Sequence, residues 1–235
     1  MSSWEDEARN WIAWTRVDAF PLYAPQFLEE IVPPAAGLAL EVGCGEGRVV
    51  RAMAARGHRV VGLDGSATLI QHARTQDDQS SYIRGDATAL PFADRMFAAI
   101  VAYNSLQTMA QASDMVRAVA EASRVLTDGG HLCVCAAHPM TDAGRLTNER
   151  GDLSIAGSYF EQRRVEDTVT RDGVSLTCFG WTYTTEDYAR AIEDAGLVID
   201  RLREPEPVDV GEKGRAASDV WRRVPLFLFI RARKR

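Results

Sequence analysis

"LALEVGCGEGRVVRAMAARGHRVVGLD", residues Leu38 to Asp64, contains three glycines at alternate positions, Gly43, Gly45 and Gly47. The stretch predicts a strand, a glycine turn, a helix stopped by Gly57 and a second strand. Glycine allows positive φ, and because it has no side chain it lets a ligand approach the backbone. A strand that runs through such a turn into a helix is typical of a nucleotide-binding loop.

The spacing of the glycines narrows the choice of nucleotide. The dinucleotide fingerprint is G-x-G-x-x-G, whereas here the third glycine, Gly47, comes one place earlier. Glu41 stands at the end of the strand before the turn. A pyrophosphate requires a positive environment, so an acid beside the turn favours a ligand that carries a cation, such as an amino group or a sulfonium. A nicotinamide dinucleotide remains the alternative.

Outward from this stretch, short apolar runs alternate with helical stretches as far as His138. Ser66 is a candidate cap for the helix after the second strand. Gly129 and Gly130 are expected to end the helix that precedes the fifth strand. Such alternation predicts a parallel sheet with helices on both faces. The expected strands are 38–42, 58–64, 81–86, 97–104 and 131–138, and the expected helices are 48–57, 66–75 and 113–126.

Beyond His138 the rhythm changes. Arg171-Asp172-Gly173 lies between two extended segments and predicts a hairpin. A helix follows, with Thr184 or Thr185 as its N-cap and Gly196 at its end. Two further strands, 197–205 and 225–233, are expected to pair in antiparallel fashion at one edge of the sheet.

The amino-terminal segment is rich in aromatic residues, and Trp11 and Trp14 lie three apart, on one face of a helix. This face either packs against the edge of the sheet or forms a lid over a ligand. We expect one domain over 1–235. Its expected parts are a helical cap (1–36), a cofactor-binding core (37–140), an insertion or lid (141–183), and a carboxyl-terminal helix and strand pair (184–235).

The formal net charge of −6 disfavours a nucleic-acid partner, because phosphate contacts require a dense basic surface. The four cysteines include no CxxC pair and no Cys/His cluster, so we expect reduced thiols and no metal site. The acidic, polar start resembles no secretory signal, and the longest apolar run near the end is too short to span a bilayer. These features predict a cytoplasmic protein without a membrane partner.

Five motifs in order, "EVGCGEG", "GLD", "GDATALPFAD", "RVLTDGG" and "HLCVCAAH", resemble those of class I S-adenosylmethionine-dependent methyltransferases. The last quarter of the chain is similar to the end of the small-molecule branch, with a methyltransferase type 11-like domain. The resemblance implies an α/β, Rossmann-like, seven-stranded and mostly parallel sheet with an antiparallel last strand. It also implies helices on both faces, a helical amino-terminal lid and a β-hairpin insertion after strand 5. The implied activity is methyl transfer from S-adenosyl-L-methionine to a small-molecule acceptor, with S-adenosyl-L-homocysteine as product.

The resemblance also implies roles for residues near the methionine part of the cofactor. Gly43 and Gly45 would lie against it, in the turn that Gly47 completes, with Glu41 below near its amino group. Asn104, at the end of the fourth strand, would open the loop under the transferable methyl group.

For the adenosine part, the resemblance implies four residues. Asp64, at the end of the second strand, would accept hydrogen bonds from the ribose hydroxyls, and Gly65 would follow at the adenine edge. Asp86 would accept from the adenine amino group while the Ala87 N–H meets the ring.

A general base is less evident. Many relatives have a histidine pair after the fourth strand, where this chain has Gln107 and Thr108. Of the four histidines, His138 is expected at the carboxyl end of a strand, where open α/β sheets bind ligands, and Pro139 keeps it extended. His138 either takes a proton from the acceptor or bonds to backbone. A non-catalytic S-adenosylmethionine-binding protein of the same fold is the alternative to an enzyme, and an NAD-dependent oxidoreductase is a second alternative.

Overall fold

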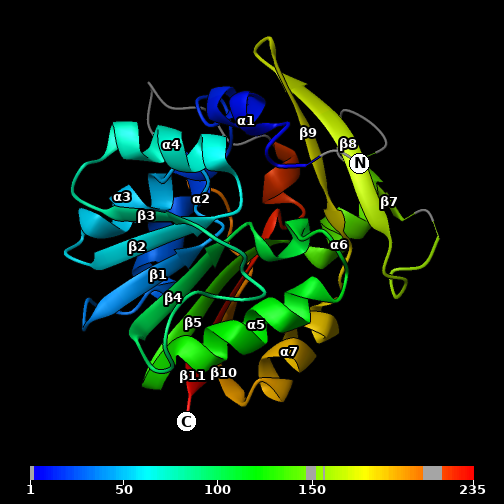
Figure 1. Ribbon diagram of the computed structural model, residues 1–235. Helices are drawn as coiled ribbons and strands as arrows, with labels where there is room; N and C mark the ends of the chain where they lie inside the picture. Colours follow the sequence, from blue (N-terminus) through cyan, green and yellow to red (C-terminus); the bar gives the residue numbers. More distant parts are fainter. Residues whose placement is uncertain (1–2, 147–151, 156, 209–218) are drawn as a thin grey trace.

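The computed structural model describes residues 3–146, 152–155, 157–208 and 219–235. Seven strands form one sheet among these residues, in the order β10-β11-β5-β4-β1-β2-β3 (Figure 1). Strand β11 is antiparallel to its neighbours β5 and β10, and the other neighbouring pairs are parallel. The expected sheet with its antiparallel last strand is confirmed. The strands are β1 (Leu38–Val42), β2 (Arg59–Asp64), β3 (Ser81–Arg84), β4 (Phe97–Tyr103), β5 (Leu126–Ala137), β10 (Leu197–Arg203) and β11 (Phe227–Lys234).

Two apolar clusters cover the two faces of the sheet, and β4 shows how one strand serves both. Ala99 and Val101 belong to the cluster under α3 and α4, whereas Ile100 and Ala102 belong to the cluster under α5 and α7. Side chains of a strand alternate between faces, so a strand buried on both faces is apolar throughout. The helices are α3 (Arg48–Ala54), α4 (Ala67–Gln76), α5 (Asp114–Val125) and α7 (Thr185–Asp194).

The caps of these helices match the sequence closely. The Ser66 hydroxyl accepts from the Leu69 N–H at 3.1 Å and caps α4. Thr184 and Asp187 exchange hydrogen bonds in a capping box at the start of α7. The start of each of these two helices is thereby set by local sequence, and Gly196, at φ 76°, follows the end of α7.

Some element boundaries differ from the expectations. Helix α5 ends at Val125, and Gly129 and Gly130 lie inside β5 instead of ending the helix. Leu126 is already extended and pairs with Phe97, so the sheet captures the chain before the glycines are reached. At the other end, β5 stops at Ala137, one residue before His138, and β3 stops at Arg84, two residues before Asp86.

The amino-terminal segment is helical, as expected, with α1 (Ala8–Trp14), α2 (Phe20–Gln26) and the π-helical turn η1 (Phe27–Ile31). The Phe27 ring packs on Phe229 of β11 with their centroids 5.1 Å apart, so this segment covers one face of the sheet. Helix α1 instead contacts both α4 and β9, and therefore bridges the core and the insertion (Figure 1).

The insertion after β5 begins with the short helix α6 (Pro139–Ala143), which the sequence analysis did not predict. Strands β6 (Gly144–Leu146) and β7 (Leu153–Ile155) pair next, and the predicted hairpin follows as β8 (Arg164–Arg171) and β9 (Val174–Trp181). Its turn residues Asp172 and Gly173 both have positive φ, 49° and 78°. Positive φ at both central positions is the type I′ geometry that suits hairpins. Residues 1–2 of the expected cap, 147–151 and 156 of the insertion and 209–218 of the carboxyl-terminal part lie outside the described residues.

Candidate functional site

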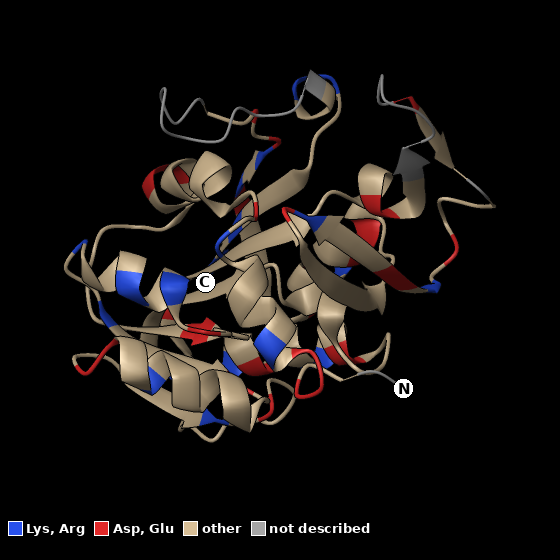
Figure 2. Cartoon of the chain, turned by 90° about the horizontal axis from the view of Figure 1, so that it is seen from above, with Lys and Arg blue, Asp and Glu red and all other residues tan. Residues whose placement is uncertain are grey.

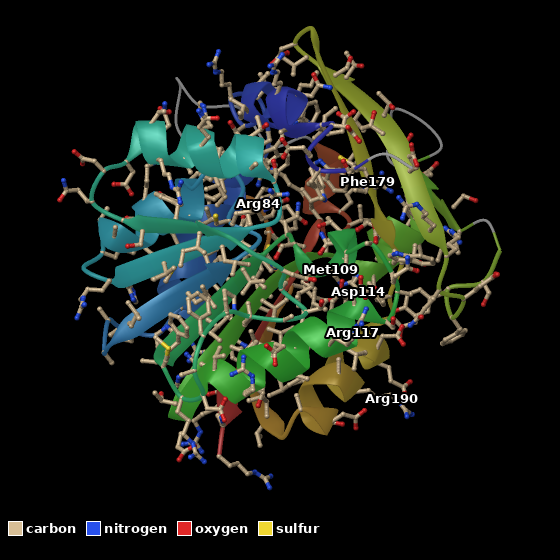
Figure 3. All side chains as sticks on the ribbon, in the orientation of Figure 1. Arg84, Met109, Asp114, Arg117, Phe179 and Arg190 are labelled. Carbon is tan, nitrogen blue, oxygen red and sulfur yellow. The ribbon has the colours of Figure 1, made fainter. Side chains whose placement is uncertain are left out.

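A cavity of about 1390 Å³ lies where the carboxyl ends of the parallel strands meet the cap and the hairpin. Figure 3 shows three of its lining side chains from separate elements: Arg84 at the end of β3, Met109 in the loop after β4, and Phe179 on β9. Open α/β sheets bind ligands at this edge, beyond the carboxyl ends of the strands. Of the ten site residues expected from the sequence, seven line the cavity: Gly43, Gly45, Asp64, Gly65, Asp86, Ala87 and Asn104.

The glycine turn forms one wall. Gly43 has φ 72°, and a Cβ added there would lie 2.4 Å from the Cβ of Ser105. Gly45 has φ 54°, and its added Cβ would lie 3.0 Å from the Trp11 Nε1. Both positions thus combine a left-handed backbone with a close approach, which requires glycine. Gly47 is the N-cap of α3 and packs against Tyr82, away from the cavity lining.

Glu41 lies beneath this turn and is 2% exposed. Its Oε2 has no hydrogen-bond partner among the described residues. Burial raises the pKa of the Glu41 carboxyl well above its usual range, opposed by the charge of Arg48. A buried acceptor without a donor is costly, so a cationic N–H group above the turn would stabilise the charged form of this carboxyl.

Asp64 joins the second strand to the glycine turn. Its Oδ2 accepts from the Gly45 N–H and its Oδ1 from the Ser66 N–H, each at 2.8 Å. Burial raises the pKa of Asp64, and these backbone donors oppose the rise. Each carboxylate oxygen can accept more than one hydrogen bond. Asp64 therefore holds the turn in place and still presents acceptors to a ligand in the cavity.

The residues at the end of β3 form a third part of the wall. The Asp86 Oδ1 accepts from the Thr88 N–H and hydroxyl, both at 2.8 Å, which is an Asx turn. The Arg84 Nε donates to the Gly65 carbonyl at 3.1 Å and ties this loop to the end of β2. Asp86 is accordingly positioned by its own turn beside Ala87.

Asn104 has φ 56° at the end of β4, where its N–H donates to the Cys135 carbonyl at 2.6 Å. Its Oδ1 accepts from the Gln107 Nε2. The Gln107 Oε1 is buried and has no partner among the described residues. The two amides close the floor of the cavity with one acceptor unsatisfied.

The cap closes the cavity from the amino-terminal side. Trp4 packs on Trp11 at 5.6 Å and on Phe179 of β9 at 4.8 Å between ring centroids. The Glu5 carboxylate accepts from the hydroxyls of Ser66 and Thr68, both at 2.6 Å. These two hydroxyls lower the pKa of Glu5 to about 2. The lid interpretation of this segment is supported, since Trp4, Trp11 and Trp14 all line the cavity.

Arg48, immediately after the glycine turn, also lines the cavity, and the sequence analysis did not include it. Its guanidinium pairs with Asp18 and lies over the rings of Phe20, at 4.3 Å, and Trp11, at 5.2 Å. Such cation–π contacts link the first turn of α3 to the cap. The sequence did not predict the contact between Arg48 and the cap, because the aromatic cap residues lie about thirty residues away from Arg48 along the chain.

His138 is not part of the cavity lining. Its Nδ1 accepts from the Met140 N–H at 3.2 Å and caps α6, and its Nε2 lies 2.8 Å from a Glu204 carboxylate oxygen. With Nδ1 as acceptor, Nε2 carries the proton and donates to Glu204. Both ring nitrogens are engaged, so this geometry gives no support to His138 as a general base.

The cavity has a mainly aromatic wall, and the residues involved come from distant parts of the chain. Ring side chains from the cap, β4, β9 and the end of the chain line it: Trp14, Phe20, Tyr103, Phe179, Trp181, Trp221 and Phe227. Asp142 of α6 adds a carboxyl to this wall, and burial raises its pKa to about 6. Sequence reasoning missed Asp142; Pro139, a favoured first residue of a helix, was the signal that a short helix begins there.

Among the described residues, no group of three or more His, Cys, Asp or Glu side chains is arranged to hold a metal ion. No helix in the described part of the chain is long and apolar enough to cross a membrane. All four cysteines are free thiols.

Comparison with known proteins gives a consistent result for the core. Residues 40–134 match the family model of the methyltransferase domain. A 2-phytyl-1,4-naphtoquinone methyltransferase of Thermosynechococcus vestitus is 35% identical over 117 residues, which are 47% of this chain and 51% of the relative. A malonyl-[acyl-carrier protein] O-methyltransferase of Erwinia pyrifoliae is 36% identical over 107 residues, 46% of this chain and 40% of the relative. The chain therefore spans about half or less of the curated relatives it matches.

The fold as a whole also matches solved structures. An S-adenosylmethionine-dependent methyltransferase from Mesorhizobium loti has a TM-score of 0.70 at 23% identity, over 93% of this chain and 99% of that one. At this identity the likeness concerns the fold. The cap and the insertion therefore share their general architecture with such proteins, although the family model covers only the core.

Proposed function

Because residues 40–134 match the family model of the methyltransferase domain, we propose that the protein binds S-adenosyl-L-methionine in its cavity and transfers the methyl group to a small molecule. The observation that carries the proposal is the hydrogen bond from the Gly45 N–H to the Asp64 carboxylate. This bond fixes the glycine turn beside Asp64 at the carboxyl end of β2. The two most strongly implied cofactor motifs thus meet at one wall of the cavity.

The residues present suit this cofactor. Gly43 and Gly45 would lie against its methionine part, with the orphaned Glu41 oxygen below the turn facing its ammonium group. Asp64 would accept from the ribose hydroxyls, because its oxygens have spare acceptor capacity.

At the other end, Gly65, Asp86 and Ala87 line the part of the cavity that an adenine ring would fill. Asn104 would lie under the methyl group, on the loop after β4. Gly47 supports the turn from outside by capping α3.

When bound, S-adenosyl-L-methionine supplies an electrophilic methyl group, and its carbon–sulfur bond breaks with the electron pair left on sulfur. The protein's part is to align the acceptor and exclude water. The cap and the hairpin do both, since Trp4 contacts Phe179 across the cavity mouth and Trp11 covers Gly45.

We propose a small, largely apolar acceptor. The aromatic wall supports this, and one of the two named relatives is by its name a 2-phytyl-1,4-naphtoquinone methyltransferase. A nucleic-acid acceptor is disfavoured by the net charge of −6. Figure 2 shows Lys and Arg interspersed with Asp and Glu over the helices and the hairpin, with no extended basic face in that view. The free thiols favour a reducing compartment, and we place the protein in the cytoplasm.

The test is turnover with S-adenosyl-L-methionine labelled in its methyl group, against naphthols, hydroquinones, amines and carboxylic acids. We expect label in an extracted small molecule and an equal amount of S-adenosyl-L-homocysteine. Cofactor binding without transfer to any of these acceptors would favour the alternative, a binding protein that retains the fold.

A further inference from the structure

The short helix α6 fixes a carboxyl group in the wall of the cavity at the end of β5. Asp142 lies on its last turn, and its N–H donates to the His138 carbonyl at 2.8 Å. The Thr141 hydroxyl donates to the carbonyls of His138 and Pro225, both at 3.0 Å. The His138 side chain caps the start of the same helix. These bonds fix α6, and with it the backbone of Asp142, in the wall of the cavity.

The Asp142 carboxyl is available to a ligand in the cavity. No hydrogen bond or ion pair to the Asp142 side chain occurs among the described residues. The charged and titratable groups that interact with it electrostatically are Arg163 before β8, Cys178 on β9 and Tyr188 on α7. The Arg163 guanidinium donates to the Ala143 carbonyl at 2.5 Å, so a positive charge lies at the end of the same helix.

We propose that Asp142 accepts a hydrogen bond from the acceptor's hydroxyl group and then takes its proton, and that the acceptor is a phenol-type molecule. This inference rests on the proposed methyl transfer. The aromatic wall fits a flat ring, and a hydroxyl on such a ring supplies one donor for the Asp142 carboxylate. Arg163 disfavours a cationic amine at the same place and favours the negative charge that develops on a phenol oxygen.

The proton balance is simple. The O–H bond of the acceptor breaks, its electron pair stays on the oxygen that bonds to the methyl carbon, and the proton moves to a carboxylate oxygen of Asp142. A base works best when its pKa lies near the working pH. Burial raises the pKa of Asp142 to about 6, so the group is an anion at neutral pH and a stronger base than an exposed aspartate.

The experiment compares two probes that differ in one hydroxyl. Binding of 1-naphthol and of naphthalene to the full chain loaded with S-adenosyl-L-homocysteine is measured at pH 7.5, in the wild type, in Asp142→Asn and in Asp194→Asn. Asp194 is an exposed carboxylate at the end of α7 and serves as the matched control. We expect Asp142→Asn to weaken the binding of 1-naphthol by about tenfold or more, as for the loss of a hydrogen bond to a charged group. The binding of naphthalene should be unchanged. Asp194→Asn should change neither.

Equal weakening of both probes, or no preference for 1-naphthol over naphthalene in the wild type, would overturn the proposal. Should Asp142→Asn fail to fold, the wild type alone decides at a second pH. Its preference for 1-naphthol should fall between pH 7.5 and pH 5 as the carboxylate with a pKa of about 6 takes up a proton. A preference that does not change over this range would contradict the assignment.

A calorimetric titration of the same three proteins with S-adenosyl-L-methionine separates this inference from the proposed function. Unchanged cofactor affinity in Asp142→Asn is expected. Failure of the cofactor to bind the wild type would remove the proposed function and this inference with it, whereas intact cofactor binding without the 1-naphthol preference would remove this inference alone.

Discussion

The two halves of the cavity are built in different ways. The proposed cofactor half comes from loops that follow neighbouring parallel strands, β1 to β4, between Glu41 and Asn104. The proposed acceptor half combines the cap, α6, the hairpin and the end of the chain, which are far apart in the sequence. Local sequence thus determines the first half, whereas the second exists only once the tertiary structure has formed.

The two halves also differ in what holds them. In the cofactor half, Asp64 is 9% exposed and is bonded to the backbone of two loops. The cap is held by ring contacts, by the ion pair of Asp18 with Arg48 and by an exposed carboxylate, Glu5. Exposed polar contacts contribute little to stability. We therefore expect the cofactor half to be preformed and the cap to open and close over it.

The largest effect is expected from the glycine turn. Gly45→Val should weaken binding of S-adenosyl-L-methionine by about 100-fold or more, because a β-branched side chain beside Trp11 would intrude on the ligand. Gly57→Val is the matched control, since Gly57 has φ 87° but nothing within 4 Å of an added Cβ. Calorimetry on both variants checks this. Wild-type affinity in folded Gly45→Val would show that the turn is not the cofactor site.

Asp64→Ala should have the next largest effect. We expect a loss of about 1.5–3 kcal/mol in cofactor binding, because hydrogen bonds to a charged group are removed. The free energy of unfolding should fall as well, since the Gly45 and Ser66 N–H groups lose their acceptor. Calorimetry and denaturant unfolding measure the two losses separately. A folded variant with unchanged cofactor affinity would refute the ribose assignment.

In the acceptor half, His138→Ala should act on stability. We expect a loss of about 1 kcal/mol in the free energy of unfolding, because α6 loses its N-cap, and a smaller loss for His138→Asn, whose side chain can also cap a helix. Denaturant unfolding of the two variants checks this. Equal stability of the wild type and His138→Ala, together with a loss of turnover, would restore His138 as the base.

The smallest effect is expected at the contact between cap and core. Glu5→Gln should speed hydrogen exchange in residues 4–14 by about two- to tenfold, as for an exposed ion contact. Because bonds from Ser66 and Thr68 lower the pKa of Glu5 from 4.5 to about 2, its contribution is present above pH 4.5 and is lost as the pH falls toward 2. Glu186→Gln, which removes an exposed carboxylate on α7, is the control. Unchanged exchange in Glu5→Gln would mean that the aromatic contacts alone hold the cap.

The sequence predicted most of the fold because its signals are local. The glycine turn, the Ser66 and Thr184 caps and the Asp172-Gly173 turn each depend on neighbouring residues, and each formed as expected. The prediction that Gly129 and Gly130 end α5 was wrong, because pairing of Leu126 with the sheet ends the helix before these glycines. A tertiary contact there outweighed a local preference.

The acceptor half was much less accessible from the sequence. A histidine at a strand end was a reasonable candidate for a base, but His138 turned its side chain to cap α6 and to meet Glu204. Asp142 and Arg48 acquire their surroundings from Arg163, Cys178, Phe20 and Asp18, none of which is near them in the chain pattern. Spacing along one segment cannot reveal such partners.

The central claim is that the glycine turn and Asp64 bind S-adenosyl-L-methionine, and a calorimetric titration of the wild-type chain tests it most directly. We predict one site per chain for S-adenosyl-L-methionine and for S-adenosyl-L-homocysteine, and no heat of binding with NAD under the same conditions. Binding of NAD in place of S-adenosyl-L-methionine, or binding of neither, would contradict the account.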